Sequence, residues 1–246
     1  MPLNKEQRLA LRQRWHPQAD DRVFGMVERA LDRYIRAGAC VLDAGSGTGT
    51  WVLDRYNDRI RLLVGADIEP PAQRSLAAPV LADLAALPFT DGSFDVILCY
   101  NVIEHLADPG QALREFARLL TRGGALIFKT PNATAPVTAL GNRLPLGLRR
   151  RIKGQLGVGA EHVFPTYYRC NTLDHLHRAL TAAGLQCEML LAVDQTYDYL
   201  YFSRATYVLG LLYSRLVGSP CLSWLRNAII GVYTKGVSAG NCSRLG

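Results

Sequence analysis

The stretch VLDAGSGTGTWVLDRY occupies residues 41–56 and combines three local patterns. Its apolar beginning, together with Ala39 and Cys40 before it, is typical of a short buried strand. Glycines at positions 45, 47 and 49 follow, and a helix is expected from about Thr48 onward. Because glycine has no Cβ atom, such a turn lets a ligand lie against the backbone. The stretch therefore predicts a ligand-binding turn between a buried strand and a helix.

Strand and helix patterns alternate along the rest of the chain. Apolar runs predict further strands at residues 61–67, 79–83, 93–101, 125–132, 185–193 and 227–236. Helices are predicted at residues 4–14, 20–36, 70–78, 109–120 and 171–184, with Asp108 and either Asn171 or Thr172 as N-caps. The glycines of TRGG, residues 121–124, are expected to end the helix before them. Apolar strands without alternation are covered on both faces, so the pattern predicts an α/β fold with a doubly wound parallel sheet.

The composition is that of an ordinary globular protein of 246 residues, with 49% hydrophobic and 20% charged residues. The formal net charge of +7 favours anionic partners such as nucleic acid, phosphorylated substrates or an acidic membrane surface. The first residues lack the apolar core of a signal peptide, and no run reaches the roughly 18 apolar residues of a membrane span. We therefore expect a cytoplasmic protein whose six scattered cysteines are reduced thiols.

Acidic residues stand at or near the ends of the first three predicted strands, at Asp43, Asp67 and Asp83. A carboxylate at the end of the second strand can accept two hydrogen bonds from a ribose diol. The glycines do not complete the dinucleotide pattern G-x-G-x-x-G, because Thr50 stands where the third glycine would fall. The turn therefore argues against a nicotinamide cofactor.

Four segments resemble, in the same order, the motifs of class I S-adenosylmethionine-dependent methyltransferases. They are VLDAGSGTG, VGADI, ADLAALPFTDGSFDVILCYNVIEHL and LREFARLLTRGGALIFKTPN, within residues 38–132. The branch resembled contains the ubiquinone and menaquinone biosynthesis methyltransferases and many small-molecule O-methyltransferases. The resemblance implies a Rossmann-like, seven-stranded, mostly parallel sheet of order 3-2-1-4-5-7-6, with the last strand antiparallel and helical insertions after strands 5 and 6.

The resemblance also implies that the cofactor is S-adenosyl-L-methionine and assigns the residues that hold it. The glycine turn, with Asp43, Ala44, Gly45, Ser46 and Gly47, would pass under the methionine part. The remaining contacts would come from the ends of the next strands: Asp67 to the ribose hydroxyls, Ile68 against the adenine, Asp83 to the adenine amino group with Leu84 beside it, and Asn101 and Val102 at the methionine end.

Methyl transfer to a hydroxyl requires alignment of the acceptor and removal of its proton. Histidine suits the second task because its ordinary pKa lies near neutrality. His105 and His162 are the two candidate bases. Alternatively, His105 shapes its loop by contacting Glu104 or the backbone, and His162 packs within a lid. No metal site is expected, since His175 and His177, two residues apart, would point to different faces of a helix.

The expected acceptor is a small molecule or a lipid-like compound, and a quinone-type phenol, a free or lipid-linked sugar and a secondary-metabolite hydroxyl all remain open. A basic run contains Arg143, Arg149, Arg150, Arg151 and Lys153, and residues 197–217 are rich in tyrosine and leucine. Such a combination is typical of peripheral contact with an anionic membrane, or of the wall of an apolar pocket. We expect residues 197–217 to form a mostly helical element near the acceptor entrance, on the same side as the arginines.

Two other functions fit parts of the sequence. A nucleic-acid methyltransferase would suit the positive charge, but the N/D-P-P-Y/F motif of base-methylating enzymes is replaced here by YNVIEH. A non-catalytic, cofactor-binding partner subunit is the second alternative. A single methyltransferase domain is expected over residues 1–246, with N-terminal helices at 1–37, the cofactor-binding core at 38–131, an acceptor-site lid at 132–170 and an apolar helical insertion at 194–225.

Overall fold

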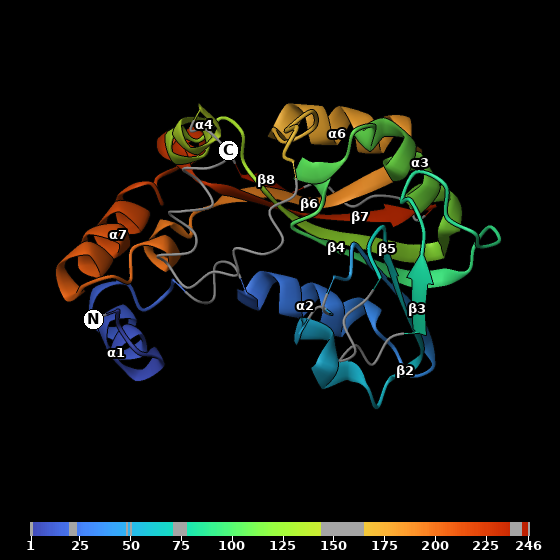
Figure 1. Ribbon diagram of the computed structural model, residues 1–246, viewed down its shortest axis with the longest axis horizontal. Helices are drawn as coiled ribbons and strands as arrows, with labels where there is room; N and C mark the ends of the chain where they lie inside the picture. Colours follow the sequence, from blue (N-terminus) through green and yellow to red (C-terminus); the bar gives the residue numbers. More distant parts are fainter. Residues whose placement is uncertain are drawn as a thin grey trace.

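The computed structural model describes residues 2–19, 24–47, 49, 51–70, 78–143, 165–236 and 243–245. Its centre is a sheet with α2 on one face and α3 and α6 on the other, as Figure 1 shows. The strands are β1 (Ala39–Ala44), β2 (Ile60–Asp67), β3 (Ala78–Leu81), β4 (Phe94–Tyr100), β5 (Leu120–Pro131), β6 (Leu185–Val193), β7 (Ala228–Lys235) and β8 (Ser243–Leu245). The α-helices are α1 (Lys5–Trp15), α2 (Phe24–Tyr34), α3 (Pro109–Leu119), α4 (Pro136–Arg143), α6 (Leu173–Ala182) and α7 (Arg204–Leu216).

The strand order confirms the predicted fold class. The sheet runs β3-β2-β1-β4-β5-β7-β6-β8, and β7 is antiparallel to both of its neighbours. The short strand β8, which pairs in parallel with β6, is an addition that the sequence patterns did not predict. The carboxyl ends of β1, β2, β4 and β5 therefore lie along one edge of the sheet, where open α/β sheets bind ligands.

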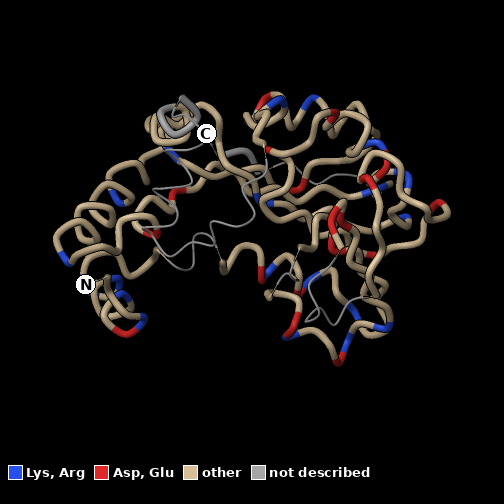
Figure 2. The backbone as a smooth tube through the Cα atoms, in the orientation of Figure 1, with Lys and Arg blue, Asp and Glu red and all other residues tan. Residues whose placement is uncertain are grey.

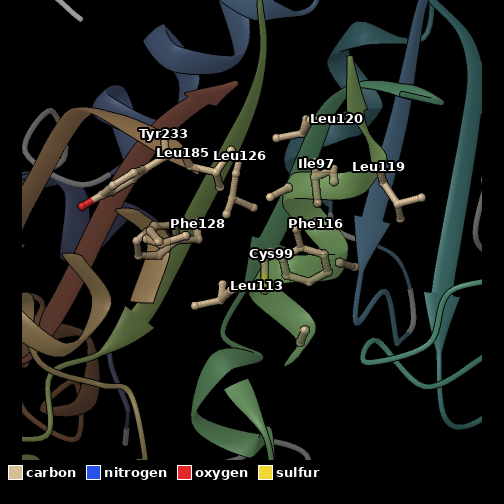
Figure 3. Close-up of a cluster of buried hydrophobic side chains, with 14 of the residues drawn as sticks. Ile97, Cys99, Leu113, Phe116, Leu119, Leu120, Leu126, Phe128, Leu185 and Tyr233 are labelled. Carbon is tan, nitrogen blue, oxygen red and sulfur yellow. The ribbon is translucent and has the colours of Figure 1, made fainter. Parts of the chain in front are cut away.

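The apolar strands are explained by two cores, one on each face of the sheet. All six residues of β1 are buried, and neighbours on the strand serve different cores: Leu42 packs with Phe116 of α3, whereas Val41 packs with Leu31 of α2. Figure 3 shows the first core, where Phe116 lies beside Cys99 of β4. Because successive side chains of a strand point to opposite faces, a continuous apolar run is what a sheet covered on both sides requires.

Several local predictions hold and others need correction. Asp108 caps α3 by accepting a hydrogen bond from the Gln111 amide at 2.9 Å, and Thr172 rather than Asn171 caps α6. Helix α3 ends at Leu119, just before TRGG as predicted, although residues 121–124 already lie within β5. The helix expected from Thr48 is, within the described residues, the short three-ten helix η1 (Trp51–Tyr56). The helix expected at residues 70–78 lies almost wholly outside the described residues.

The cysteines follow the expectation only in part. Cys40, Cys99, Cys170 and Cys221 are free thiols. Cys187 of β6, in contrast, is disulfide-bonded, so the expectation of six reduced thiols is wrong at this position. The spacing of cysteines along a chain does not show which residues the fold brings together, and for this reason the sequence did not reveal the bond.

The two insertions leave the sheet at its ligand-binding edge. Residues 144–164, with Arg149 to Arg151, Lys153 and His162, lie outside the described residues. The insertion after β6 is helical and consists of η3 (Thr196–Tyr199), α7 and η4 (Pro220–Leu225). Helix α7 lies beside α1, away from the centre of the sheet (Figure 1). Tyr197, Tyr207 and Leu211 are fully buried between these elements, in a third apolar cluster.

Among the helices of the described residues, none combines the length and the hydropathy of a membrane-spanning segment.

Candidate active site

The glycine turn after β1 requires glycine for two reasons. Gly45, Gly47 and Gly49 have φ angles of 77°, 49° and 96°, in the left-handed region that favours glycine. The Gly45 amide donates a hydrogen bond to the Ala66 carbonyl of β2 at 2.8 Å, which ties the turn to the neighbouring strand. A Cβ atom on Gly45 would lie 2.3 Å from Cγ2 of Val102. The loop after β4 therefore packs directly on the turn, as a shared binding site requires.

The side chain of Asp67, at the end of β2, is hydrogen-bonded to the glycine turn. Its Oδ2 accepts a hydrogen bond from the Gly47 amide at 2.8 Å, and its Oδ1 accepts one from the Glu69 amide at 3.0 Å. Each carboxylate oxygen can accept a second hydrogen bond, so these contacts leave capacity for a ribose diol. A Cβ atom on Gly47 would meet nothing within 4 Å, so the turn borders open space.

Ser46 provides a further test of whether a polar ligand fits the turn. Its side chain is 5% exposed, and within the described part of the chain its Oγ has no hydrogen-bond partner. A buried hydroxyl without a partner costs about 1–3 kcal/mol. Asp43 and Ala44, at the end of β1, are also buried and support the turn from beneath. The buried hydroxyl, the bare glycines and the Asp67 carboxylate together fit the methionine and ribose parts of S-adenosylmethionine.

Of the residues expected to contact the adenine, some are exposed and one is buried in the core. Ile68 is 62% exposed, which leaves an apolar surface next to Asp67 for a flat ring. Asp83 is exposed, and its Oδ1 accepts a hydrogen bond from the Ala85 amide at 2.9 Å. The side chain of Leu84 packs in the first core instead. At this position the backbone, rather than the leucine side chain, is the group that could face the adenine.

The loop after β4 contains a backbone position of higher energy. Asn101 has a φ angle of 58°, and its amide donates a hydrogen bond to the Lys129 carbonyl of β5 at 2.8 Å. Residues other than glycine rarely adopt this conformation, and those that do are concentrated at functional sites. The bend turns the chain so that Val102 reaches Gly45. Asn101, Val102 and the glycine turn thus meet where the resemblance places the methionine end of the cofactor.

His105 makes both of the contacts that the alternative interpretation expects. Its Nδ1 lies 2.8 Å from the Pro165 carbonyl oxygen, and its Nε2 lies 3.9 Å from Glu104 Oε1. Because a carbonyl oxygen can only accept, Nδ1 must carry a proton, and in the neutral ring Nε2 is then the nitrogen with the lone pair. The same contacts that fix the loop therefore also orient the ring as a proton acceptor. His162, the other candidate base, lies outside the described residues.

Glu104 is a buried acid that the sequence reasoning named only as a contact of His105. It is 4% exposed, and it accepts a hydrogen bond at 2.9 Å from Thr130 Oγ1, which in turn accepts one from the Asn171 amide nitrogen at 2.5 Å. Burial raises the pKa of the Glu104 carboxyl, while His105 and the Thr130 hydroxyl act in the opposite direction. The backbone carbonyl of Glu104 accepts the Tyr167 amide at 2.8 Å, so Tyr167, itself 47% exposed, borders this site.

Lys129 is a second buried charge that the sequence reasoning missed. It is 8% exposed at the carboxyl end of β5, and its Nζ lies 4.9 Å from the centre of the Tyr100 ring. Burial lowers the pKa of Lys129 to about 8, although the charges of Asp198 and Glu104 act to raise it. A lysine within the apolar run ALIFKTPN was the available signal. Through Asp198, the insertion after β6 brings a charge close to the site.

Replacing Lys129 with methionine is expected to raise the free energy of unfolding at pH 7 by about 1–3 kcal/mol, because the buried charge is removed. The ordinary lysine pKa is 10.5 and the folded pKa is about 8, so the unfolded chain binds more protons between these values. The stability contributed at this position therefore rises with pH across that window. The advantage of Lys129→Met should be largest below pH 8 and shrink towards pH 10.5. Urea unfolding at pH 7 and pH 10 measures both effects.

The exposed Lys5 supplies the control, since Lys5→Met should leave the pH dependence unchanged. A Lys129→Met protein that is no more stable than the wild type at pH 7 would contradict a net cost of burying the ammonium group of Lys129.

Comparison with known proteins identifies the core of the chain. Residues 42–128 match the methyltransferase domain family. The ubiquinone biosynthesis O-methyltransferase of Caulobacter vibrioides is 33% identical over 131 residues, which cover 46% of this chain and 52% of that protein. The enzyme of the same name from Xanthomonas oryzae pv. oryzae is 33% identical over 116 residues, covering 42% of this chain and 48% of that protein. The chain spans about a third to a half of the length of the curated relatives that it matches.

Solved structures share the fold over nearly the whole chain. The [4+2]-cyclase SpnF superposes with a TM-score of 0.55 at 20% identity, covering 90% of this chain and 82% of that one. A geranyl diphosphate C-methyltransferase from Streptomyces coelicolor A3(2), crystallised with S-adenosyl-L-homocysteine, gives a TM-score of 0.55 at 15% identity, covering 96% and 85%. At these identities the likeness concerns the fold, and a cyclase among the matches shows that the fold does not determine the reaction. The sheet order and the glycine turn, together with the family match over residues 42–128, support a class I S-adenosylmethionine-dependent methyltransferase.

Proposed function

We propose that the protein transfers a methyl group to a hydroxyl oxygen of a small-molecule or lipid-like acceptor. The observation that carries this proposal is the oriented His105 ring, which stands beside a buried carboxylate three residues beyond Val102, at the edge of the glycine turn. A hydroxyl acceptor needs a proton acceptor in this place, whereas an acceptor without a proton to lose does not. The named O-methyltransferases among the relatives support the same chemistry.

The residues of the turn would hold the cofactor. Gly45 and Gly47 leave room for the methionine part, the buried Ser46 hydroxyl offers a polar contact, and Asp67 would accept hydrogen bonds from the ribose hydroxyls. S-adenosylmethionine supplies a methyl group on a positively charged sulfur, so the leaving group needs no further activation. The protein has to align the acceptor and manage one proton, and alignment alone can contribute several kcal/mol.

His105 would accept the proton of the acceptor hydroxyl at Nε2. The Pro165 carbonyl holds the proton on Nδ1 and thereby keeps the Nε2 lone pair available. After the transfer the ring carries a positive charge, and the Glu104 carboxylate 3.9 Å away stabilises it. Thr130 and Asn171 keep that carboxylate in place through their hydrogen bonds. This arrangement of an acid, a histidine and a fixed tautomer follows the general logic of an activated base.

Turnover with a panel of acceptors tests the proposal. We would incubate the purified protein with one acceptor at a time and with S-adenosylmethionine that carries a labelled methyl group. Mass spectrometry would then measure S-adenosylhomocysteine and the methylated product. The panel contains simple phenols, a prenylated phenol, a free sugar and RNA. We expect product from an acceptor with a free hydroxyl and none from the same compound with that hydroxyl already methylated.

Two results would overturn the proposal in favour of its rivals. Tight binding of S-adenosylhomocysteine without turnover on any member of the panel would favour the non-catalytic partner subunit. Salt-dependent incorporation of label into RNA would favour a nucleic-acid methyltransferase.

A further inference from the structure

The outer face of α7 is unusual for a surface helix. Leu209, Leu212 and Leu216 are 63%, 40% and 65% exposed, and their spacing of three and four residues places them on one side of the helix. The opposite side is buried through Tyr207 and Leu211. A helix with one buried apolar side normally carries polar residues on the other. The exposed leucines are therefore not needed for packing within the described structure.

Two elements linked to α7 also expose large apolar residues. Trp224 of η4 is 55% exposed and Val137 of α4 is 43% exposed. The Tyr213 hydroxyl of α7 donates to the Leu225 carbonyl at 3.0 Å, and the hydroxyl of Thr134, which precedes α4, donates to the Trp224 carbonyl at 3.4 Å. These hydrogen bonds link η4 to α7 and to the start of α4. We call Val137, Leu209, Leu212, Leu216 and Trp224 the outer apolar face.

The segments that carry the outer apolar face have charges of one sign. Acids on neighbouring elements, among them Glu6 of α1 and Asp198 of η3, lie on elements packed against the buried side of α7. The sequence contains no aspartate or glutamate at residues 116–160 or 199–246, the two stretches that supply these elements. Arg204 begins α7 and Arg215 lies in its last turn, and both are exposed. Figure 2 shows blue positions along the α7 tube without a red one. An anionic partner would match this surface, and a cationic one would be repelled.

We propose that the outer apolar face docks on the surface of an anionic lipid bilayer. Leucines and a tryptophan can enter the interface between headgroups and acyl chains, while the flanking arginines remain at the level of the phosphates. A second copy of the chain fits less well, because a two-fold interface places a surface against itself and would bring Arg204 and Arg215 near arginines with no acid to balance them. Most of the docked face belongs to the insertion after β6, which also carries Asp198, and the charge of Asp198 acts on Lys129 at the candidate site.

Vesicle sedimentation tests the docking without any measurement of methyl transfer. At low salt the protein should bind vesicles of phosphatidylcholine with phosphatidylglycerol and not vesicles of phosphatidylcholine alone, and salt should weaken the binding. The double variant Leu209→Ser/Leu216→Ser should lower the binding constant by at least about tenfold, from the loss of inserted apolar area. Arg204→Ser/Arg215→Ser should lower it by about fivefold for each arginine. A blue shift of tryptophan emission on binding should disappear in Trp224→Phe.

The matched control is Leu62→Ser/Leu81→Ser, because these leucines are 41% and 65% exposed on β2 and β3, away from α7. This variant should bind vesicles like the wild type, and circular dichroism should show that all variants are folded. Absence of vesicle binding at low salt would overturn the proposal, as would unchanged binding in the leucine variant. Concentration-dependent dimerisation that Leu209→Ser/Leu216→Ser abolishes would instead show that a second copy covers the outer apolar face.

Discussion

Replacing His105 with alanine is expected to lower the turnover of a hydroxyl acceptor by about 10²–10⁴-fold, the range that a positioned base contributes. The imidazole ring is oriented by the Pro165 carbonyl and stands beside Glu104, so its loss removes both the proton acceptor and the partner of the buried carboxylate. The affinity for S-adenosylhomocysteine should stay unchanged, because Pro165 and Glu104 contact the ring, whereas the glycine turn is held by Ala66 and Asp67. Steady-state kinetics with saturating cofactor gives the first quantity and calorimetry the second.

The pH profile separates proton transfer from a purely structural role. In the wild type, turnover should depend on pH because a base must hold a free lone pair, and in His105→Ala this dependence should be absent. Glu104→Gln should lower turnover less than His105→Ala does. Glutamine can still accept the hydrogen bond from Thr130, but it cannot stabilise the protonated ring. His175→Ala is the matched control, since His175 is exposed on α6.

Full activity of His105→Ala would contradict the role of His105 as the base. The remaining histidine candidate would then be His162, and His162→Ala would be the next variant to measure. Full activity of both single variants would leave alignment of the acceptor as the main source of catalysis.

Asp67→Ala is expected to weaken the binding of S-adenosylhomocysteine by about 1–3 kcal/mol, or about 5–150-fold. The variant loses the hydrogen bonds to the ribose hydroxyls and also the anchor of the Gly47 amide, 2.8 Å from Oδ2. The affinity of Asp67→Asn for S-adenosylhomocysteine should lie between those of Asp67→Ala and the wild type. The asparagine side-chain oxygen can still accept one of these hydrogen bonds, although the charge is lost. Isothermal titration calorimetry measures all three proteins. Nicotinamide cofactors should not bind to any of them.

Asp58→Ala is the control for a general effect of losing an acid. Asp58 is exposed and immediately precedes Arg59 and β2, so it stands at the opposite end of the strand from Asp67. Its replacement should leave the affinity unchanged. An Asp67→Ala protein that binds S-adenosylhomocysteine as tightly as the wild type would remove Asp67 from the cofactor site.

The fold could be predicted from the sequence to an unusual extent because its signals are local. Apolar runs, the Asp108 cap and the glycines after β1 each act through neighbours a few residues away. In a doubly wound sheet these local elements also determine where the ligand edge lies, since the parallel strands all end there. The residues expected around the glycine turn came from the resemblance to the methyltransferase motifs, and the close approach of Val102 to Gly45 agrees with that assignment.

The errors arose where a local signal competes with pairing in the sheet. The TRGG stretch is typical of a turn, but it lies within a longer β5 as an irregularity between Leu120 and Ala125, both of which pair with β4. Asn171 is as good an N-cap as Thr172, but it is buried and donates to Thr130 across 41 positions of the chain. A residue with two possible partners takes the one that satisfies a buried polar group, and local sequence does not show which group is buried.

Local patterns in the sequence predicted the strands and the glycine turn, because each depends on residues that are close in the chain, and the resemblance of four ordered motifs implied the sheet order and the class of cofactor. The chemistry beside the turn depends on residues that are not close. Glu104 meets Thr130 across 26 positions, and His105 meets Pro165 across 60. Burial of Glu104 and Lys129, and exposure of Leu209 and Leu216, are properties of the packed structure. The tautomer of the histidine, the shifted pKa values and the outer apolar face follow from tertiary packing, since burial and electrostatic environment are set by everything that surrounds a side chain.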